Sequence, residues 1–342
     1  MTEHSLPTTQ HAVRVDQPGG PDALRWVEAP VPTPGPGEVL VKTAATGLNF
    51  IETYQRSGQY SMSPPFVPGS EGSGTVVALG AGVDGGAAGP AGSVGSVTVG
   101  DVVATAAGTG TYAEYFTAPV GQLLPVPEGV DAVTAAAVPL QGMTAHYLCR
   151  STVEVRSGQT VLIHAGAGGV GLLLTQLCVR LGATVITTAS SGQKHELSRE
   201  AGASHVLDYA GFAERVRELT DGHGVDAVFD GVGQETFDES LQALRVRGTL
   251  VLFGAASGPV PPFDPQRLNG AGSLFLTRPT LAHHTVTSEE TRWRAEELFT
   301  ALREDALRFR VGATYSLADA AKAHQDLEQR RTTGKSLLLP NG

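Results

Sequence analysis

The sequence has few cysteines and no long apolar segment. Only Cys149 and Cys178 are present, and no Cys-x-x-Cys pair occurs, which excludes a structural zinc site built on cysteines. Both lie in apolar segments, where buried free thiols are expected, as in a reducing cytoplasm. No apolar run reaches the ~20 residues that cross a bilayer. The N-terminus has no basic segment followed by an apolar core, so we expect neither a membrane span nor secretion.

Positive charge is scarce as well. The chain carries 24 Lys and Arg against 34 Asp and Glu, a formal net charge of −10. This acidic balance argues against a nucleic acid or an anionic membrane surface as partner. The hydrophobic fraction of 41% is that of an ordinary globular enzyme, and 342 residues exceed one comfortable core, so two domains are expected.

Glycine, by contrast, is abundant, with 43 residues, and one glycine-rich turn lies between two regular elements. The β-branched run at residues 160–164 predicts a buried strand, and residues 172–181 predict an apolar helix. The spacing G-x-G-x-x-G between them gives the candidate binding residues Gly166, Gly168, Gly169, Val170 and Gly171. In this context the glycines permit a tight turn and close approach to a pyrophosphate. The alternative is a glycine-rich connection that binds nothing.

The next strand, which begins at residues 185–186, has no acidic residue at its end. An NAD site usually places Asp or Glu there to accept from the ribose hydroxyls, but residues 172–194 contain no acid. Ser190, Lys194 and Arg199 occur instead and suit a 2′-phosphate. NADPH is therefore favoured over NADH, unless these cations are ordinary solvated charges.

The pattern of elements changes along the chain. Short strands with turn signals fill the first part, for example at residues 24–28 and 38–44, which is typical of an antiparallel barrel-like domain. From Asp131 the pattern becomes helical, and strands then alternate with helices. This alternation predicts a parallel sheet with helices on both faces. The glycine-rich residues 80–100 predict a surface loop without assigned chemistry.

Seven segments resemble one known family. In order they are GLNFIETYQRSGQY, PPFVPGSEGSGTV, LQGMTA, HAGAGGVG, SSGQK, FDGVG and GKSLLLP. Together they resemble the zinc-independent quinone oxidoreductases, the ζ-crystallin-like group of the medium-chain dehydrogenase/reductase superfamily, over residues 11–340. The resemblance implies an α/β fold with three parts: a GroES-like antiparallel β-barrel catalytic domain (1–130), a doubly wound Rossmann domain that binds NADPH (131–280), and a C-terminal segment completing the catalytic domain (281–342).

The resemblance also implies roles for individual residues. Asn49 and Tyr54 would lie beside the nicotinamide, and Gln141 near the substrate. Beyond the glycine turn, the implied cofactor contacts are Thr144, Ser190, Lys194, Tyr209, Phe253, Thr277 and Arg330. Some have plainer interpretations: Asn49 as a helix cap, Tyr54 as a core aromatic, and Phe253 as packing alone.

The zinc ligands of related dehydrogenases are missing. Where zinc-dependent relatives have Cys, His and usually Cys, this sequence has Asn49, Ser70 and Gln141, so no thiolate or imidazole is offered and no metal is expected. The region in which relatives carry a structural zinc loop, residues 80–110, has no cysteine. Residues 85–98 look like an insertion relative to the family and have no assigned role.

The implied function is NADPH-dependent reduction of a quinone by hydride transfer, in a cytoplasmic homodimer. A quinone accepts hydride readily, whereas an ordinary ketone would miss the carbonyl polarisation that a metal supplies. The alternatives are an NADPH-dependent enone or 2-alkenal double-bond reductase and a non-catalytic, crystallin-like NADPH-binding protein. The source of the product's proton is left open between Tyr54 and water.

Overall fold

The structure is a computed structural model that describes residues 6–83 and 97–340. Residues 84–96, which include most of the predicted surface loop and insertion, lie outside this description. Within the described ranges, no helix combines the length and the hydropathy that crossing a bilayer requires.

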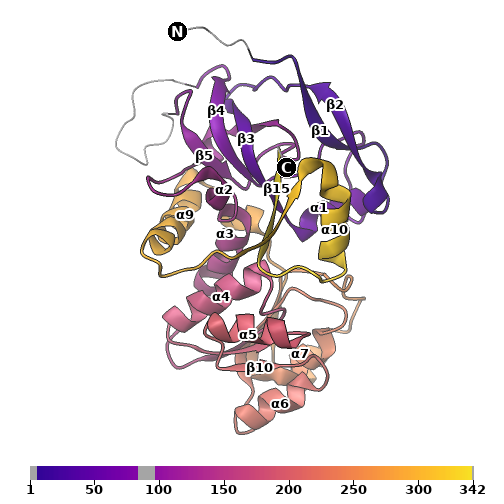
Figure 1. The fold of residues 1–342 in the computed structure, drawn as a ribbon. Helices are drawn as coiled ribbons and strands as arrows, with labels where there is room; N and C mark the ends of the chain where they lie inside the picture. The colour runs from indigo at the N-terminus through magenta and orange to yellow at the C-terminus, as the bar shows by residue number, and fades with distance from the viewer. Residues whose placement is uncertain (1–5, 84–96, 341–342) are drawn as a thin grey trace. The chain divides into compact units, whose positions relative to one another are not determined.

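The chain forms two compact units, each visible in Figure 1. The first unit contains Met1–Leu140, Thr287–Glu304 and Phe309–Gly342, and the second contains Gln141–Val286 with Asp305–Arg308. The domain limits predicted above, after residues 130 and 280, stay a prediction.

The first unit is built on two sheets. Strands β1 and β2 pair with each other, and a larger sheet has the order β14-β15-β3-β4-β5-β7, with β6 paired to β3. Its pairings are antiparallel except for β14 with β15, which confirms the predicted antiparallel domain. The strands are β1 (Thr9–Val15), β2 (Leu24–Pro30), β3 (Glu38–Leu48), β4 (Gly72–Leu79), β5 (Val102–Thr105), β6 (Tyr115–Pro119), β7 (Leu124–Pro125), β14 (Val311–Ser316) and β15 (Lys335–Leu339).

The helices of the first unit are short except for α9. They are η1 (Pro21–Ala23), α1 (Phe50–Ser57), η2 (Val120–Gln122), α2 (Ala132–Ala135), α9 (Ser288–Arg303), η5 (Leu317–Asp319) and α10 (Ala320–Glu328). Strand β3 continues to Leu48, beyond the predicted end at residue 44, because residues 46–48 pair with β15. This extension carries the chain directly to α1, whose first turn is part of the candidate site.

The second unit is a parallel sheet of six strands with the order β10-β9-β8-β11-β12-β13, which confirms the predicted doubly wound fold. Its strands are β8 (Thr160–Ile163), β9 (Thr184–Thr188), β10 (His205–Leu207), β11 (Val225–Asp230), β12 (Leu244–Leu252) and β13 (Phe275–Thr277). Its helices are η3 (Leu148–Thr152), α4 (Gly169–Arg180), α5 (Gly192–Glu200), α6 (Phe212–Leu219), α7 (Phe237–Ala243), α8 (Gln266–Gly270) and η4 (Leu281–His284), and α3 (Pro139–Tyr147) begins in the first unit.

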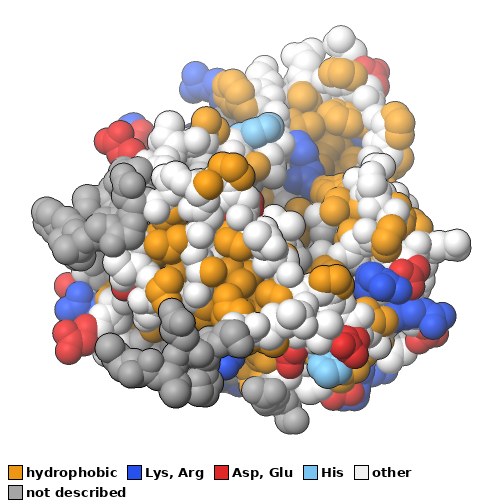
Figure 2. Space-filling model, turned by 90° about the horizontal axis from the view of Figure 1, so that it is seen from above, with side chains coloured by type: hydrophobic (Ala, Val, Ile, Leu, Met, Phe, Trp, Pro, Cys, Tyr) orange, Lys and Arg blue, Asp and Glu red, His pale blue; other side chains and the backbone are white. Residues whose placement is uncertain are grey.

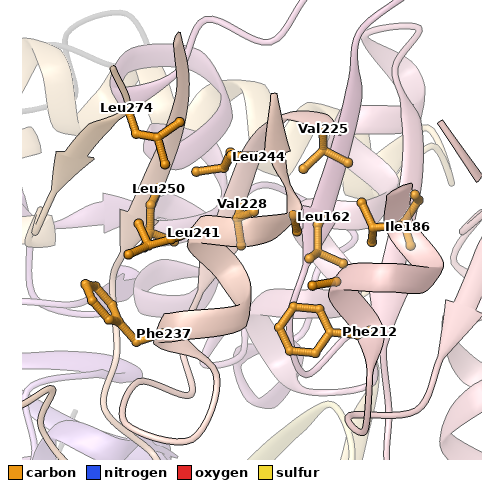
Figure 3. Close-up of a cluster of buried hydrophobic side chains, with 13 residues drawn as sticks. Leu162, Ile186, Phe212, Val225, Val228, Phe237, Leu241, Leu244, Leu250 and Leu274 are labelled. Carbon is orange, nitrogen blue, oxygen red and sulfur yellow. The ribbon is translucent and has the colours of Figure 1, made fainter. Parts of the chain in front are cut away.

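Apolar residues on both strands and helices hold this sheet. Figure 3 shows Leu162 and Val228 of neighbouring strands facing Phe212 of α6 and Leu241 of α7 in one buried cluster. The strands read as continuous apolar runs because a parallel sheet is covered on both faces. Burial of each such side chain contributes about 1.5–3 kcal/mol.

The strand order also locates the ligand edge of the sheet. The chain runs from β8 outward to β9 and β10, then returns to β11 on the other side of β8 and continues to β12 and β13. The order therefore reverses between β8 and β11. Ligands of open α/β sheets bind outside the carboxyl ends of the strands at such a reversal.

Candidate functional site

The glycine turn connects β8 to α4, with Gly168 as the helix N-cap. At Gly166 a Cβ would lie 2.6 Å from the Thr187 Cβ of β9, and at Gly171 a Cβ would overlap the carbonyl oxygen of Ala165. A side chain at either position would push the turn out of place. The first N–H groups of α4 and the positive end of its dipole face outward from this turn. The turn is thus shaped to hold an anionic group such as a pyrophosphate.

A chain of buried hydrogen bonds supports the turn from below. His164 lies 2.9 Å through Nε2 from Ser240 Oγ and 2.9 Å through Nδ1 from Thr188 Oγ1. Ser240 Oγ also lies 3.2 Å from Asp230 Oδ2. Because a carboxylate only accepts, Ser240 donates to Asp230 and accepts from His164 Nε2–H, and Thr188 donates to Nδ1. Burial lowers the pKa of His164 against the opposing charge of Asp230, so a neutral imidazole joins the ends of β8, β9 and β11.

Ser190 and Lys194 lie together just beyond β9. Ser191 is the N-cap of α5 and accepts from the Lys194 N–H, while Lys194 Nζ lies 3.5 Å from Ser190 Oγ. Arg199, which the sequence also suggested for the 2′-phosphate, is paired with Glu196 at 2.5 Å. The edge beside β9 therefore offers an ammonium and a hydroxyl to an anion.

Gln141 and Thr144 lie one turn apart on α3. A Cβ at Gly169 would lie 2.8 Å from Gln141 Nε2 and would overlap Gln141 Oε1. The structure thus brings Gln141, predicted near the substrate, against the glycine turn. A side chain at residue 169 would displace the Gln141 amide from this position.

Three further candidates lie at the same edge of the sheet. Tyr209 follows β10 and stacks on His164, with ring centroids 6.3 Å apart. Phe253 follows β12 and packs on Gly231, where a Cβ would lie 2.8 Å from the phenyl ring. Thr277 is the last residue of β13. All three lie at or just after the carboxyl ends of strands, where the strand order predicts a ligand.

The remaining candidates belong to the first unit. Tyr54 lies on α1 and forms an aromatic group with Phe50 and Tyr60, at ring distances of 6.2 and 5.3 Å. Arg330 follows α10 with a left-handed backbone, φ 57°. That Arg330 contacts the cofactor stays a prediction.

Asn49 is the N-cap of α1, as the plainer interpretation has it, and forms a capping box with Glu52, but its side chain also reaches two charged groups. Its backbone N–H donates to Glu52 Oε2 at 2.8 Å. Its amide lies 2.9 Å through Nδ2 from Glu71 Oε2 and 2.8 Å through Oδ1 from Lys335 Nζ. Glu71 and Lys335 also form an ion pair with each other, with side chains 0% and 3% exposed. We call Asn49, Glu52, Glu71 and Lys335 the buried cluster.

Glu52 is the second carboxyl group of the buried cluster. Burial raises its pKa to about 8; Lys335 opposes this shift and Glu71 adds to it. At neutral pH the group therefore carries a proton. The buried cluster then holds one carboxylate and one ammonium, and its net charge is zero.

Sequence reasoning missed Glu52, Glu71 and Lys335. Each lies inside a segment that carried the family resemblance, yet none was assigned a role. The available signal was a single charged residue among uncharged neighbours. Glu71 is flanked by serine and glycine, and Lys335 begins the otherwise uncharged strand KSLLL. No local pattern brings them together, since Lys335 and Asn49 are 286 residues apart.

The positions at which related dehydrogenases hold zinc carry no strong ligand here. The Asn49 side chain is hydrogen-bonded to Glu71 and Lys335, and Ser70 has a hydroxyl group in place of the histidine imidazole. Across residues 6–83 and 97–340, no group of three or more His, Cys, Asp or Glu side chains is arranged to hold a metal ion.

Comparison with known proteins agrees with both units. Residues 35–128 match the alcohol dehydrogenase GroES-like domain family, and residues 169–301 match the zinc-binding dehydrogenase family. A quinone oxidoreductase of Pseudomonas aeruginosa is 43% identical, over 94% of this chain and 97% of that protein. A 2-haloacrylate reductase of a Burkholderia species is 39% identical, over 96% and 98%.

A solved structure gives the same result. A mycobacterial protein whose structure contains NADPH is 56% identical to this chain. The similarity covers 96% of this chain and 100% of the other, with a TM-score of 0.93. With these similarities over nearly its full length, the chain belongs to the quinone oxidoreductase family of the medium-chain dehydrogenase/reductase superfamily.

Proposed function

We propose that this protein is an NADPH-dependent quinone reductase that transfers hydride without zinc. The observation that carries the proposal is the glycine turn beside the Ser190–Lys194 edge, with no acid between α4 and Lys194. The NADPH in the mycobacterial relative and the name of the Pseudomonas relative support it.

The second unit supplies the proposed cofactor site. NADPH, when bound, supplies the hydride. The N–H groups at residues 168–171 would hold its pyrophosphate, and Ser190 with Lys194 its 2′-phosphate. The remaining proposed contacts are Thr144, Gly166, Tyr209, Phe253, Thr277 and Arg330.

Asn49, Tyr54 and Gln141 are the proposed substrate-side residues. The aromatic ring of Tyr54 suits a flat, electron-poor acceptor. Zinc is not part of the proposal, because the Asn49 amide already binds an ammonium and a carboxylate, and neither Ser70 nor Gln141 is a strong zinc ligand. A quinone needs no metal to polarise it, since its reduction gives a stabilised anion.

Replacement of Lys194 by alanine tests the cofactor assignment. We expect Lys194→Ala to raise the KM for NADPH about 10- to 150-fold, because a charge-assisted hydrogen bond contributes ~1.5–3 kcal/mol, and to leave NADH kinetics nearly unchanged. Steady-state rates with both cofactors give the comparison. Arg156→Ala is the matched control, because it removes an exposed cation that lies four residues before the start of β8. Equal changes for NADPH and NADH would remove Lys194 from the phosphate site.

An acceptor panel tests the reaction class. We expect NADPH oxidation to be faster with a naphthoquinone than with a 2-alkenal, and to be unchanged by prolonged treatment with EDTA. The 2-haloacrylate reductase relative favours the second candidate, an enone or 2-alkenal reductase. A preference for the alkenal would select that candidate, and loss of activity with EDTA would contradict zinc independence. NADPH binding without any acceptor-dependent rate would indicate the crystallin-like alternative.

Assembly and location are also proposed. We propose a homodimer that forms at β13, the edge of the parallel sheet, because Phe275 is 61% exposed there and an edge strand offers backbone groups for pairing. The free, buried Cys149 and Cys178 suit a reducing cytoplasm. On the face in Figure 2, acidic and basic side chains are interspersed, which suits a small-molecule substrate better than a nucleic acid or a membrane.

A further inference from the structure

The ion pair of the buried cluster is fully hydrogen-bonded. Glu71 accepts from Lys335 and Asn49 at Oε2 and from the Leu140 N–H at Oε1, at 2.7 Å. Lys335 Nζ donates to Glu71, to Asn49 Oδ1 and to the Leu48 carbonyl at 3.5 Å. A buried ion pair loses the hydration of both charges, and apolar residues of the same volume are often equally stable or more so. Stability alone therefore does not explain this pair.

The end of β3 leaves space for the Glu71–Lys335 ion pair and binds the Glu71 backbone. At Gly47 a Cβ would lie 2.7 Å from Lys335 Nζ and would overlap Glu71 Oε2. Gly47 N–H donates to the Glu71 carbonyl at 3.0 Å, and Thr46 Oγ1 donates to the same oxygen at 2.7 Å. The last strand residues before α1 thus hold the Glu71 backbone, and the missing side chain of Gly47 leaves room for the ion pair.

The pair fixes which way the Asn49 amide points. Lysine has only donors, so the atom at 2.8 Å from Nζ is the amide oxygen. Ionised Glu71 has only acceptors, so the atom at 2.9 Å from its Oε2 is the amide nitrogen. A flipped amide would set donor against donor and oxygen against oxygen. Two opposite charges therefore give Asn49 one orientation.

Glu52 completes the cluster from inside α1. Its Oε2 accepts the Asn49 N–H, and the whole residue is buried. The charged groups that act on it electrostatically are Lys335 and Glu71. The buried Tyr112, on which Glu52 also acts electrostatically, is hydrogen-bonded to His324. His324 in turn contacts Arg56, and Arg56 donates to Glu328. A negative charge on Glu52 would compete with Glu71 for Lys335 and loosen the Asn49 amide.

We propose that Lys335 and Glu71 are positioning residues for hydride transfer, because they hold the Asn49 amide in the single orientation that the reaction uses. The inference rests on the proposed function, in which Asn49 lies beside the nicotinamide. Lys335 comes from the last strand and acts only through Asn49. Glu52 supports the arrangement as long as it is protonated.

Two variants test the proposal. Lys335→Met leaves the Glu71 carboxylate without its cation and threatens the fold, so Lys335→Met is also combined with Glu71→Gln, which leaves no charge in the cluster. We expect both to lower kcat for a quinone about 10- to 100-fold, as a misplacement of about 1 Å does. The dissociation constant of NADPH, measured by fluorescence titration, should stay within about twofold. The isotope effect from NADPH deuterated at C4 should rise as hydride transfer becomes slower.

Arg294→Met is the matched control. It removes another fully buried cation of the first unit, paired with Glu290 on α9, and we expect kcat to be unchanged. A folded double variant with wild-type kcat would overturn the proposal. So would parallel losses of kcat and NADPH affinity, because they would indicate general damage.

The test separates this proposal from the proposed function. If none of the acceptors in the panel supports NADPH oxidation by the wild-type protein, the proposed function fails. Crystal structures of the wild-type protein and the double variant then decide the positioning role. We expect the Asn49 amide to turn or move in the variant, and an unchanged amide would refute the role.

Discussion

Glu52→Gln is expected to stabilise the folded protein at pH 9 and to change its stability little at pH 5. The buried carboxyl has a pKa of about 8, against 4.5 for the ordinary group. Between these values the folded chain keeps a proton that the unfolded chain releases, so wild-type stability falls as pH rises through this window. Glutamine carries no charge at any pH, and its side-chain oxygen can still accept the Asn49 N–H.

The expected difference in unfolding free energy follows from the pH range between the two pKa values. Three pH units, from pH 5 to pH 8, correspond to roughly 4 kcal/mol in the difference between variant and wild type. Urea unfolding of both proteins between pH 5 and pH 9 measures it. Glu128→Gln, at an exposed carboxyl group, is the control and should follow the wild-type curve. Parallel curves for Glu52→Gln and wild type would show that Glu52 is ionised throughout.

Gly171→Ala is expected to abolish most NADPH binding. Its Cβ would overlap the Ala165 carbonyl oxygen and lie 2.9 Å from the Gly166 Cα, and both atoms are backbone that no rotamer change can move away. The turn must therefore shift. We expect a loss of about 100-fold in affinity, which corresponds to ~2.7 kcal/mol.

Fluorescence titration with NADPH measures this loss, and circular dichroism checks the fold. Gly270→Ala is the matched control: it lies at the end of α8 in the same unit, and nothing is within 4 Å of its added Cβ. It should bind NADPH like the wild type. Wild-type affinity in Gly171→Ala would mean that the cofactor does not use this turn.

The sequence predicted the features whose causes are local. The glycine spacing predicted the turn because Gly166 and Gly171 are needed within one strand–turn–helix unit. The missing acid after β9 likewise pointed to the Ser190–Lys194 edge, which the structure brings together. The roles of the individual site residues in binding and catalysis stay predictions.

Features with distant causes could not be predicted. Asn49 was expected either beside the cofactor or as a simple helix cap, and the structure shows a capping box with Glu52 together with side-chain contacts to Glu71 and Lys335. That arrangement depends on tertiary pairing of β15 with the end of β3. Similarly, β3 is longer than its alternating pattern indicates, because its last residues find a partner from the other end of the chain.

The separation of Glu71 and Lys335 has a consequence for synthesis of the protein. The two residues are 264 positions apart, so at about 5–20 residues per second the ribosome delivers the lysine roughly 10 to 50 s after the glutamate. During that interval the nascent first unit contains an acid whose counter-ion does not yet exist. The second unit, nearly all of it one continuous stretch, has no such wait. We therefore expect the middle of the polypeptide to reach its native state before its beginning does.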